Sequence, residues 1–221
     1  MKFFKLTLIA AILTSIFFLT GAAEKSLNNP NRARVYDAAQ KVCPVLVGTV
    51  IPDVTLQEVN GNTLRLMDRI SQKPTVLIFY RGGWCVYCNR QLGQLKEIEQ
   101  EILDAGFQII AVSPDRTAEV KKTYDQHELN YTLLSDSTAS AATAFGIAFR
   151  VDQPTLDRLA GYNIDLNAAS GHDHHILPVP SVFVLDKKGT ILFEYVNPVY
   201  STRLNPAVLL SAVKAAAADS E

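Results

Sequence analysis

The stretch VLIFYRGGWCVYCNRQLGQL, residues 76–95, decides how the rest of the chain is interpreted. Its first five residues are apolar or aromatic, which predicts a strand buried on both faces. Gly82 and Gly83 interrupt that run. A helix is predicted after them because apolar residues recur on one face, at Leu92, Leu95, Ile98, Ile102 and Leu103. Cys85 and Cys88 therefore lie where a buried strand ends and an amphipathic helix begins.

This position has chemical consequences for the two cysteines. The first turn of a helix has unpaired backbone N–H groups and the positive end of the helix dipole, which stabilise a thiolate and lower a cysteine pKa. Cys85 and Cys88 are three residues apart, so one thiolate can attack and the second thiol can resolve the product as a disulfide. The alternatives are half of a zinc site or a purely structural disulfide. Zinc needs about four ligands, and the chain has no second cysteine pair. We therefore favour a redox pair.

Composition excludes several other classes of protein. The 221 residues carry 21 Lys and Arg against 22 Asp and Glu, interspersed, for a net charge of −1. Nucleic-acid binding has no electrostatic support without a basic tract. Three cysteines are too few for a disulfide-stabilised scaffold.

The N-terminus has the pattern of a secretory signal. Lys2 and Lys5 precede an apolar run over residues 6–20, and small residues follow at 21–23. We expect a signal peptide over 1–23, cleaved after Ala23, and export to the periplasm or beyond. An uncleaved membrane anchor is the alternative.

The motif resembles known redox proteins. Trp84-Cys85-Val86-Tyr87-Cys88 between strand and helix resembles the active site of the thioredoxin superfamily. The wider frame FYRGGWCVYCNRQL resembles the peroxiredoxin-like branch related to alkyl hydroperoxide reductase and thiol-specific antioxidant (AhpC/TSA) proteins. The resemblance implies an α/β thioredoxin-like fold with a mixed central β-sheet flanked by helices and an N-terminal β-hairpin.

The remaining elements fit this expectation. Asn60-Gly61 between alternating runs predicts the hairpin within 48–66. The domain is expected over 48–217, after an N-terminal extension at 24–47 with a short helix over 32–42, and with an irregular insertion at about 150–177. Further strands are expected at 107–113, 131–135, 181–185 and 190–196, and further helices at 117–128, 137–145 and from 206 onward.

Two other groups of residues have alternative interpretations. His172, His174 and His175 have a spacing that could ligate a metal, but a solvated loop rich in Gly, Asn and Ser is the simpler interpretation. We expect neither a metal nor a cofactor. Cys43 is expected to be a small buried hydrophobe, with a resolving cysteine as the alternative.

The resemblance also assigns residues beside the cysteines. In thioredoxin-fold proteins a cis-proline precedes the later strand, packs beside the Cys-x-x-Cys and leaves the preceding backbone free to pair with substrate. Pro180 occupies that place here, so a cis Val179–Pro180 bond is expected. Trp84 and Arg81 are expected to face the substrate as well. The alternative is a trans proline that begins an edge strand.

The sequence supports two registers for the cysteines. Aligned with the peroxiredoxin pattern Pro-x-x-x-Thr-x-x-Cys, the proline falls on Arg81, the threonine on Cys85 and the peroxidatic cysteine on Cys88. The later peroxiredoxin arginine is replaced by Pro180-Ser181, which leaves Arg81 and Arg203 as candidates for the positive charge. In the thioredoxin register Cys85 is the exposed nucleophile and Cys88 is the resolving thiol. We favour Cys88 as the sulfur that peroxide oxidises.

The resemblance implies a peroxiredoxin-like antioxidant enzyme. It would reduce hydroperoxides through a Cys85–Cys88 disulfide that a thioredoxin-like or other thiol reductant recycles. An extracytoplasmic thiol–disulfide oxidoreductase acting on protein disulfides is the alternative, and a redox-inactive binding module is a third. The sequence leaves the oligomeric state open.

Overall fold

A seven-stranded mixed β-sheet forms the centre of the protein. The computed structural model describes residues 33–218, and the predicted signal peptide lies outside them. The strand order is β2-β1-β5-β4-β3-β8-β9, with β3, β4 and β5 parallel and the other pairs antiparallel. The strands are β1 (Thr55–Glu58), β2 (Thr63–Arg65), β3 (Thr75–Phe79), β4 (Gln108–Ser113), β5 (Thr132–Ser135), β8 (Ser181–Leu185) and β9 (Ile191–Val196). The predicted mixed sheet is confirmed.

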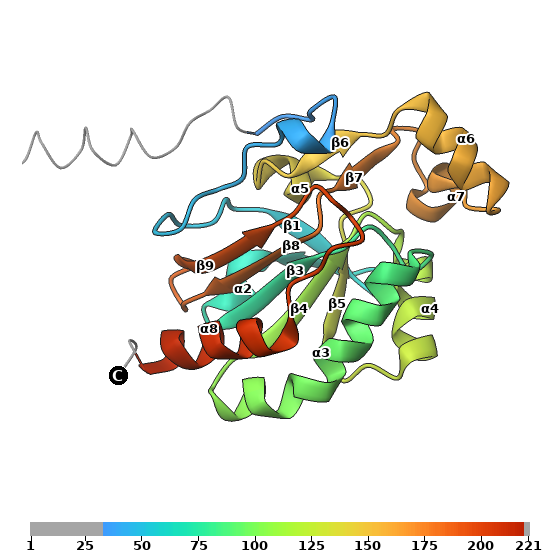
Figure 1. Cartoon of the computed structure of the whole chain (residues 1–221). Coiled ribbons are helices and arrows are strands. Elements are labelled where there is room, and N and C mark those ends of the chain that lie inside the picture. Colours follow the sequence, from blue (N-terminus) through green and yellow to red (C-terminus); the bar gives the residue numbers. More distant parts are fainter. Residues whose placement is uncertain (1–32, 219–221) are drawn as a thin grey trace, which may run out of the picture. The chain divides into compact units, whose positions relative to one another are not determined.

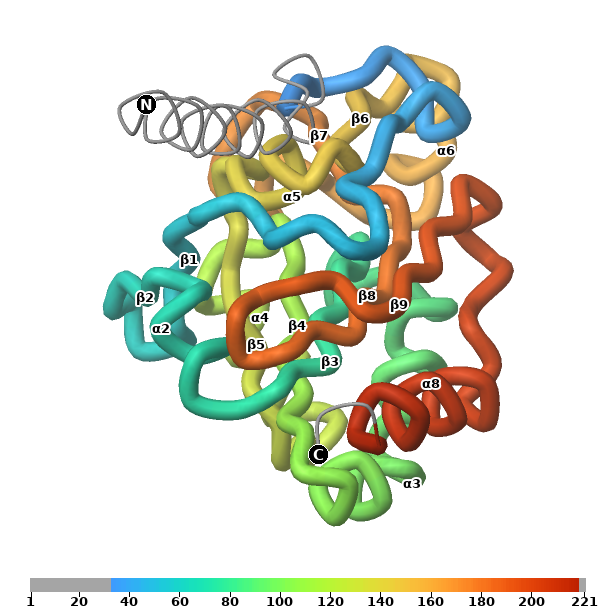
Figure 2. Tube along the Cα trace, turned by 90° about the vertical axis from the view of Figure 1, so that its left-hand side faces the viewer, coloured from blue at the N-terminus to red at the C-terminus, as the bar shows by residue number. Residues whose placement is uncertain are grey.

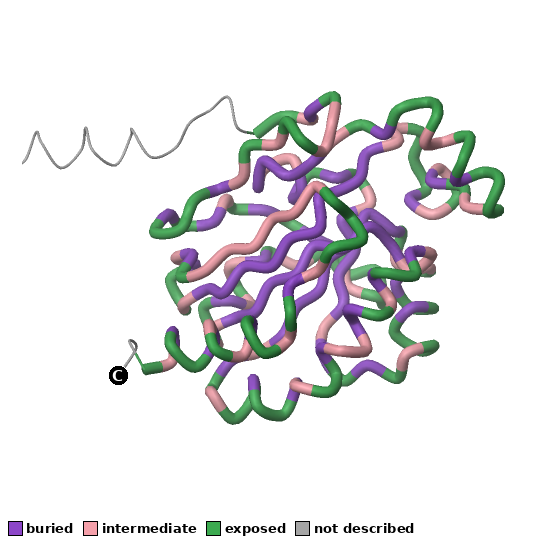
Figure 3. The backbone as a smooth tube through the Cα atoms, in the orientation of Figure 1, coloured by how far each residue is buried: buried purple, intermediate pink, exposed green. Residues whose placement is uncertain are grey.

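Helices cover both faces of the sheet, because alternate residues of each strand point to opposite sides. On β3, Val76 and Ile78 contribute to one core and Leu77 and Phe79 to the other. The first core also contains residues of α3 (Val86–Asp104), α4 (Thr117–His127) and α8 (Pro206–Ala218). The second contains residues of α2 (Leu66–Ile70) and α5 (Ser140–Ala144). Figure 1 shows α3 and α8 together on one side of the sheet, and Figure 3 shows buried backbone through its centre.

The predicted N-terminal hairpin is present at one edge of the sheet. β1 and β2 pair antiparallel, with Leu56 opposite Leu64. The turn is made where expected, since Gly61 takes a φ of +88° and Asn60 Oδ1 accepts a hydrogen bond from the Asn62 amide at 2.8 Å. Figure 2 shows this hairpin beside α2.

The insertion is more regular than the sequence indicates. β6 (Ala148–Arg150) pairs antiparallel with β7 (Ile176–Pro178), and α6 (Gln153–Gly161) and α7 (Leu166–Ser170) lie between them in the chain. Asp152 and Asp165 cap the two helices by accepting hydrogen bonds from backbone amides of the first turn. These caps are the local signal that marks both helices.

Two predictions for the segment before the sheet are wrong. Residues 32–42 were expected to be helical, but the structure has only a three-residue 3-10 helix, η1 (Ala39–Lys41). The reason is that Tyr36 pairs with the edge of β6, donating from its amide to Ala148 O and accepting from the Arg150 amide. Cys43 is exposed rather than buried, because Val42 and Val45 supply the apolar contacts there. Within residues 33–218 no helix has the length and hydropathy of a membrane span.

Candidate active site

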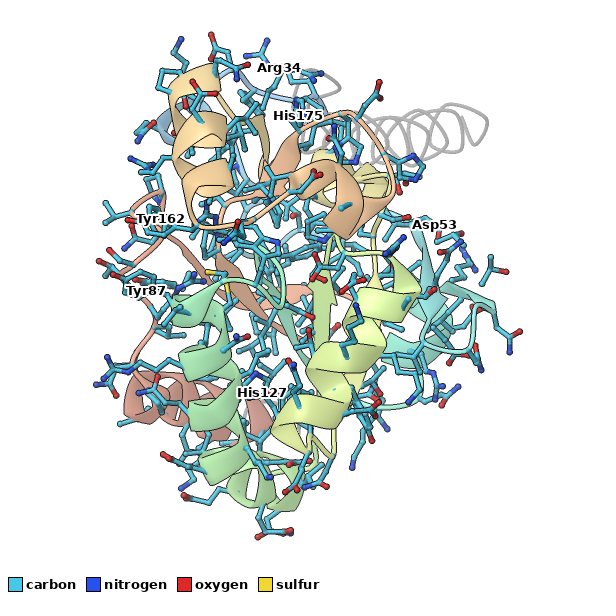
Figure 4. The ribbon with its side chains drawn as sticks, turned by 90° about the vertical axis from the view of Figure 1, so that its right-hand side faces the viewer. Arg34, Asp53, Tyr87, His127, Tyr162 and His175 are labelled. Atoms are coloured by element: carbon cyan, nitrogen blue, oxygen red, sulfur yellow. The ribbon has the colours of Figure 1, made fainter. Side chains whose placement is uncertain are left out.

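Cys85 and Cys88 lie at the N-terminal end of α3. Cys85 is the N-cap residue and Cys88 lies in the first turn, and both are free thiols. Cys85 is 4% exposed and Cys88 is fully buried. Figure 4 shows Tyr87 projecting outward from this turn, on the same side of the molecule as Tyr162 at the end of α6. The pair lies where β3 leads into α3, as the strand–helix pattern predicts. Cys85 is buried, and not exposed as the thioredoxin register predicts.

A tight glycine turn carries the chain from β3 to Cys85. Gly82 has a φ of +144°, and a Cβ on it would overlap the Trp84 indole. The Gly83 amide donates to Asp115 Oδ2 at 2.7 Å, and Asn89 Nδ2 donates to Gly83 O at 2.8 Å. These bonds fix the turn from β4 and from α3, so the cysteines are held by rigid elements on both sides.

Asp115 is a site residue to which the sequence analysis gave no function. Its carboxyl group is buried and its pKa is raised to about 7 by burial, although the Gly83 amide and Ser113 lower it. The sequence contains a feature that places Asp115 near the cysteines, because Ser113-Pro114-Asp115 follows β4, the strand that pairs with β3. The ends of adjacent parallel strands meet at the same edge of a sheet.

Arg203 brings a positive charge to the two sulfurs. It lies in the segment between β9 and α8, residues 197–205, here named the strap (Figure 1). Its Nη2 lies 3.3 Å from Cys88 Sγ and 3.9 Å from Cys85 Sγ, and its Nη1 donates to Gln91 Oε1 at 3.1 Å. Arg203 was one of two candidates for this charge. Gln91, which orients it, was not foreseen.

The two thiols differ in acidity. The pKa of Cys85 is lowered to about 6, first by a hydrogen bond from the Cys88 side chain, and further by the Cys88 amide and the charges of Arg81 and Arg203. Burial opposes this shift. The pKa of Cys88 is raised, mainly by burial. The arrangement therefore stabilises a thiolate on Cys85 with Cys88 as its protonated hydrogen-bond donor.

Arg81 packs on two aromatic rings. Its guanidinium carbon lies 5.0 Å from the centre of the Trp84 ring and 4.3 Å from that of Tyr200. Tyr200 belongs to the strap and also packs edge-on against Tyr87, with ring centres 5.8 Å apart. The strap is therefore attached to the cysteine turn through Arg81 and Tyr87 as well as through Arg203.

A family pattern that extends well beyond the cysteines agrees with the resemblance of the residues around them. The model of the AhpC/TSA family matches residues 47–193. The chain belongs to the AhpC/TSA family. Peroxiredoxin Q, chloroplastic, from Triticum aestivum is 29% identical over 150 residues, which are 68% of this chain and 58% of the relative. The chain thus spans less than two thirds of that relative's length.

Solved structures share the fold of this AhpC/TSA chain. Peroxidoxin BcpB from Mycobacterium tuberculosis has a TM-score of 0.60 at 20% identity, over 76% of this chain and 96% of that one. A protein from Chlorobium tepidum described as a thiol:disulfide interchange protein, DsbE, has a TM-score of 0.53 at 19% identity, over 78% and 98%. At these identities the likeness concerns the fold alone, which is thioredoxin-like as predicted.

The predicted cis-proline is wrong for this AhpC/TSA chain. Residues 33–218 contain no cis peptide bond, so Val179–Pro180 is trans. The Val179 amide donates to Ile147 O at 2.8 Å, which holds the extended chain between β7 and β8. That amide is therefore unavailable to an incoming substrate. Pro180 instead lines a cavity together with Arg81 and Tyr200.

The histidines of the insertion form local contacts. His172 and His174 stack with ring centres 5.7 Å apart. The His174 ring contacts Ser137 O through Nε2 at 2.8 Å and accepts from the Ile176 amide through Nδ1 at 2.9 Å. Both ring nitrogens are thus engaged within the protein. Within the described part of the chain no group of three His, Cys, Asp or Glu side chains is placed to hold a metal.

The acidity of Cys85 gives a direct prediction. In a Cys43→Ser background, the rate of Cys85 alkylation by iodoacetamide is expected to rise through a midpoint near pH 6. Arg203→Gln is expected to move that midpoint to higher pH, because a cation near the thiolate is lost. Mass spectrometry at a series of pH values measures the rate. Lys214→Gln, which removes an exposed cation of α8 paired with Glu101, is the matched control. An unchanged midpoint in Arg203→Gln would contradict the assignment.

Proposed function

We propose that this protein reduces hydroperoxides through the Cys85–Cys88 pair and that a dithiol reductant regenerates it. The observation that carries the proposal is a low-pKa thiolate on Cys85, hydrogen-bonded by a second thiol beside Arg203. Membership of the AhpC/TSA family and likeness to a peroxiredoxin Q support it.

The reaction follows from these positions. The Cys85 thiolate attacks the distal oxygen of ROOH, the O–O bond breaks, and ROH leaves after the alkoxide takes up a proton. Cys85 is then a sulfenic acid. Cys88 sulfur displaces its hydroxyl as water, which forms the Cys85–Cys88 disulfide. A reductant with two thiols exchanges with that disulfide, returns both cysteines to thiols and is itself oxidised.

Arg203 contributes electrostatically to the first step. The attack moves negative charge onto the leaving oxygen, and the guanidinium lies within reach of both sulfurs. The N–H groups in the plane of the Arg203 guanidinium can also donate hydrogen bonds to the oxygens of the hydroperoxide. We propose that Arg203 compensates for the threonine that is absent where Cys85 stands.

The acidity of the thiols supports Cys85 rather than Cys88 as the attacking sulfur. The sequence alignment favoured Cys88, since it occupies the peroxidatic position. However, Cys88 is fully buried and its pKa is raised, so at neutral pH it keeps its proton. We therefore propose that Cys85 attacks and Cys88 resolves, as in thioredoxin-like proteins, although the chain belongs to the AhpC/TSA family.

A second candidate is exchange with protein disulfides. It is favoured by the Trp-Cys-x-x-Cys motif and by the low pKa of Cys85, which suits both attacking and leaving thiols. The 4% exposure of Cys85 weighs against it, because a protein disulfide must bring its own backbone to the sulfur.

A parallel assay tests the two functions. Protein of residues 24–221, reduced and freed of excess reductant, is expected to consume one equivalent of hydroperoxide and form a Cys85–Cys88 disulfide. We expect far slower reduction of a disulfide-bonded protein such as insulin. Stopped-flow peroxide consumption and peptide mapping measure the first reaction, and turbidity of reduced insulin the second. Fast insulin reduction without peroxide consumption would replace the proposed function by the alternative.

We also propose that the chain is exported and that the mature form begins near Glu24. The support is the basic, apolar and small-residue pattern of residues 1–23. N-terminal sequencing of protein from the native host decides it. A chain that retains Met1 in the membrane fraction would favour the anchor.

A further inference from the structure

A cavity lies next to the cysteine turn on the side of Arg81. Its volume is about 230 Å³. Arg81, Pro180 and Tyr200 line it from the site. Residues 37–40 line it from the N-terminal segment, and residues 149–152, 155 and 158 from the insertion. Because Arg81 also lowers the pKa of Cys85, the cavity is within electrostatic reach of the reacting sulfur.

Arg81 has no acidic partner among residues 33–218, although it is almost completely buried. It is 6% exposed, its Nε has no hydrogen-bond partner, and none of the described acidic side chains forms an ion pair with it. A buried, unpaired guanidinium is costly unless an anion joins it. The guanidinium packs on the rings of Trp84 and Tyr200, and these contacts leave its in-plane N–H donors without an acceptor in the described part of the chain. Those donors match the two oxygens of a carboxylate.

The acids that line the cavity are already engaged. Asp37 pairs with Lys41 at 2.9 Å, and Asp152 accepts from the Thr155 amide at 3.1 Å as the cap of α6. Arg150 and Arg158 add two further cations to the lining. The lining thus has three arginines against two aspartates, which leaves one positive charge in excess.

Apolar walls accompany this charge. Phe149, Val151, Pro180 and Pro198 line the same cavity. A cavity for phosphate alone needs no such surface, whereas a short hydrocarbon chain ending in a carboxylate uses both features.

We propose that this cavity binds the carboxylate of an organic hydroperoxide, with Arg81 as the anchoring residue. The inference names a substrate class for the proposed peroxidase and rests on that function. The carboxylate lies on Arg81 and the apolar chain against the prolines. The hydroperoxide end then points toward Cys85, whose neighbour Trp84 packs on the Arg81 guanidinium. The chemical step is the one described above.

Binding is tested without any peroxide. Sodium hexanoate neutralises the charge of Arg81, so it is expected to raise the pKa of Cys85 and slow its alkylation at pH 6 by about two- to fivefold. Hexanamide, of equal length and uncharged, is expected to have no effect, and inorganic phosphate a much weaker one. Arg81→Gln is expected to abolish the response, while Arg116→Gln, an exposed arginine paired with Glu119, keeps it. Equal effects of hexanoate and hexanamide, or of hexanoate and phosphate, would overturn the inference.

Turnover provides the second measurement. We expect kcat/KM for 6-hydroperoxyhexanoic acid to exceed that for hexyl hydroperoxide by about 10- to 100-fold, as for one charged hydrogen-bonded pair. Arg81→Gln is expected to remove the difference. If both hydroperoxides react equally and hexanoate has no effect, the inference fails and the proposed function stands. If neither reacts, the proposed function fails, and the hexanoate response still decides whether the cavity binds carboxylates.

Discussion

Replacing Cys85 with serine is expected to abolish hydroperoxide consumption, with a loss on the order of a thousandfold or more. Serine keeps the size of the side chain but has no thiolate near neutral pH. In the wild-type protein the Cys88 hydrogen bond and the charges of Arg81 and Arg203 lower the pKa of Cys85 to about 6, so the attacking anion is already present at pH 7. Stopped-flow measurement of peroxide loss under single-turnover conditions tests the effect, and Cys43→Ser is the control.

The reciprocal variant distinguishes the two cysteines. Cys88→Ser is expected to consume one equivalent of hydroperoxide and to stop with a sulfenic acid on Cys85, because no thiol remains to resolve it. A dimedone-type probe followed by peptide mapping detects the adduct. If the peroxidatic position of the family pattern is the reacting one, the outcome inverts: Cys85→Ser would carry the adduct on Cys88, and the acidity argument would be wrong.

Gly83→Ala is expected to destabilise the protein by about 1–3 kcal/mol, the usual range for overpacking. A Cβ on Gly83 would overlap Oγ1 of Thr123 on α4. Gly83 is not among the glycines with positive φ, so its backbone accepts alanine and only the missing space opposes it. Urea unfolding followed by fluorescence measures the loss of stability.

Two further variants make this prediction sharp. Thr123→Ala removes the overlapping hydroxyl, so Gly83→Ala is expected to cost less in that background than in the wild type. Gly93→Ala places a Cβ inside α3 with no atom within 4 Å apart from its chain neighbours and the helix's own backbone. It is expected to stabilise the protein by about 0.5–1 kcal/mol. If Gly83→Ala lowers the free energy of unfolding equally in the wild-type and the Thr123→Ala backgrounds, the overlap with Thr123 is not the cause of the destabilisation.

Local sequence patterns predict the part of the site formed by residues close together in the chain, namely Cys85, Cys88 and the elements on either side of them. The buried strand, the glycine turn and the helix of period 3.6 place Cys85 and Cys88 without any long-range information. The hairpin at Asn60-Gly61 was predictable for the same reason. The error at residues 32–42 has the opposite origin, because pairing with β6 overrides a weak helical preference.

Long-range contacts account for what the sequence did not give. The Val179 amide beside Pro180 is paired with Ile147 O, a long-range contact that no local pattern predicts. Tyr200 and Gln91 have unremarkable neighbours in the sequence, and only the fold brings them to Arg81 and Arg203. Arg203 could be named as a candidate charge, but nothing before the structure placed it beside the sulfurs.

The position of Arg203 also sets when the thiol becomes reactive during synthesis. Its contacts with Gln91, Cys88 and Cys85 span 112, 115 and 118 residues. A chain still emerging from the ribosome has both cysteines long before it has this arginine, and contacts of such separation form late. Until the C-terminal segment has been made and packed, Cys85 lacks part of the charge that acidifies it. A smaller fraction of Cys85 is therefore thiolate in the nascent chain than in the folded protein.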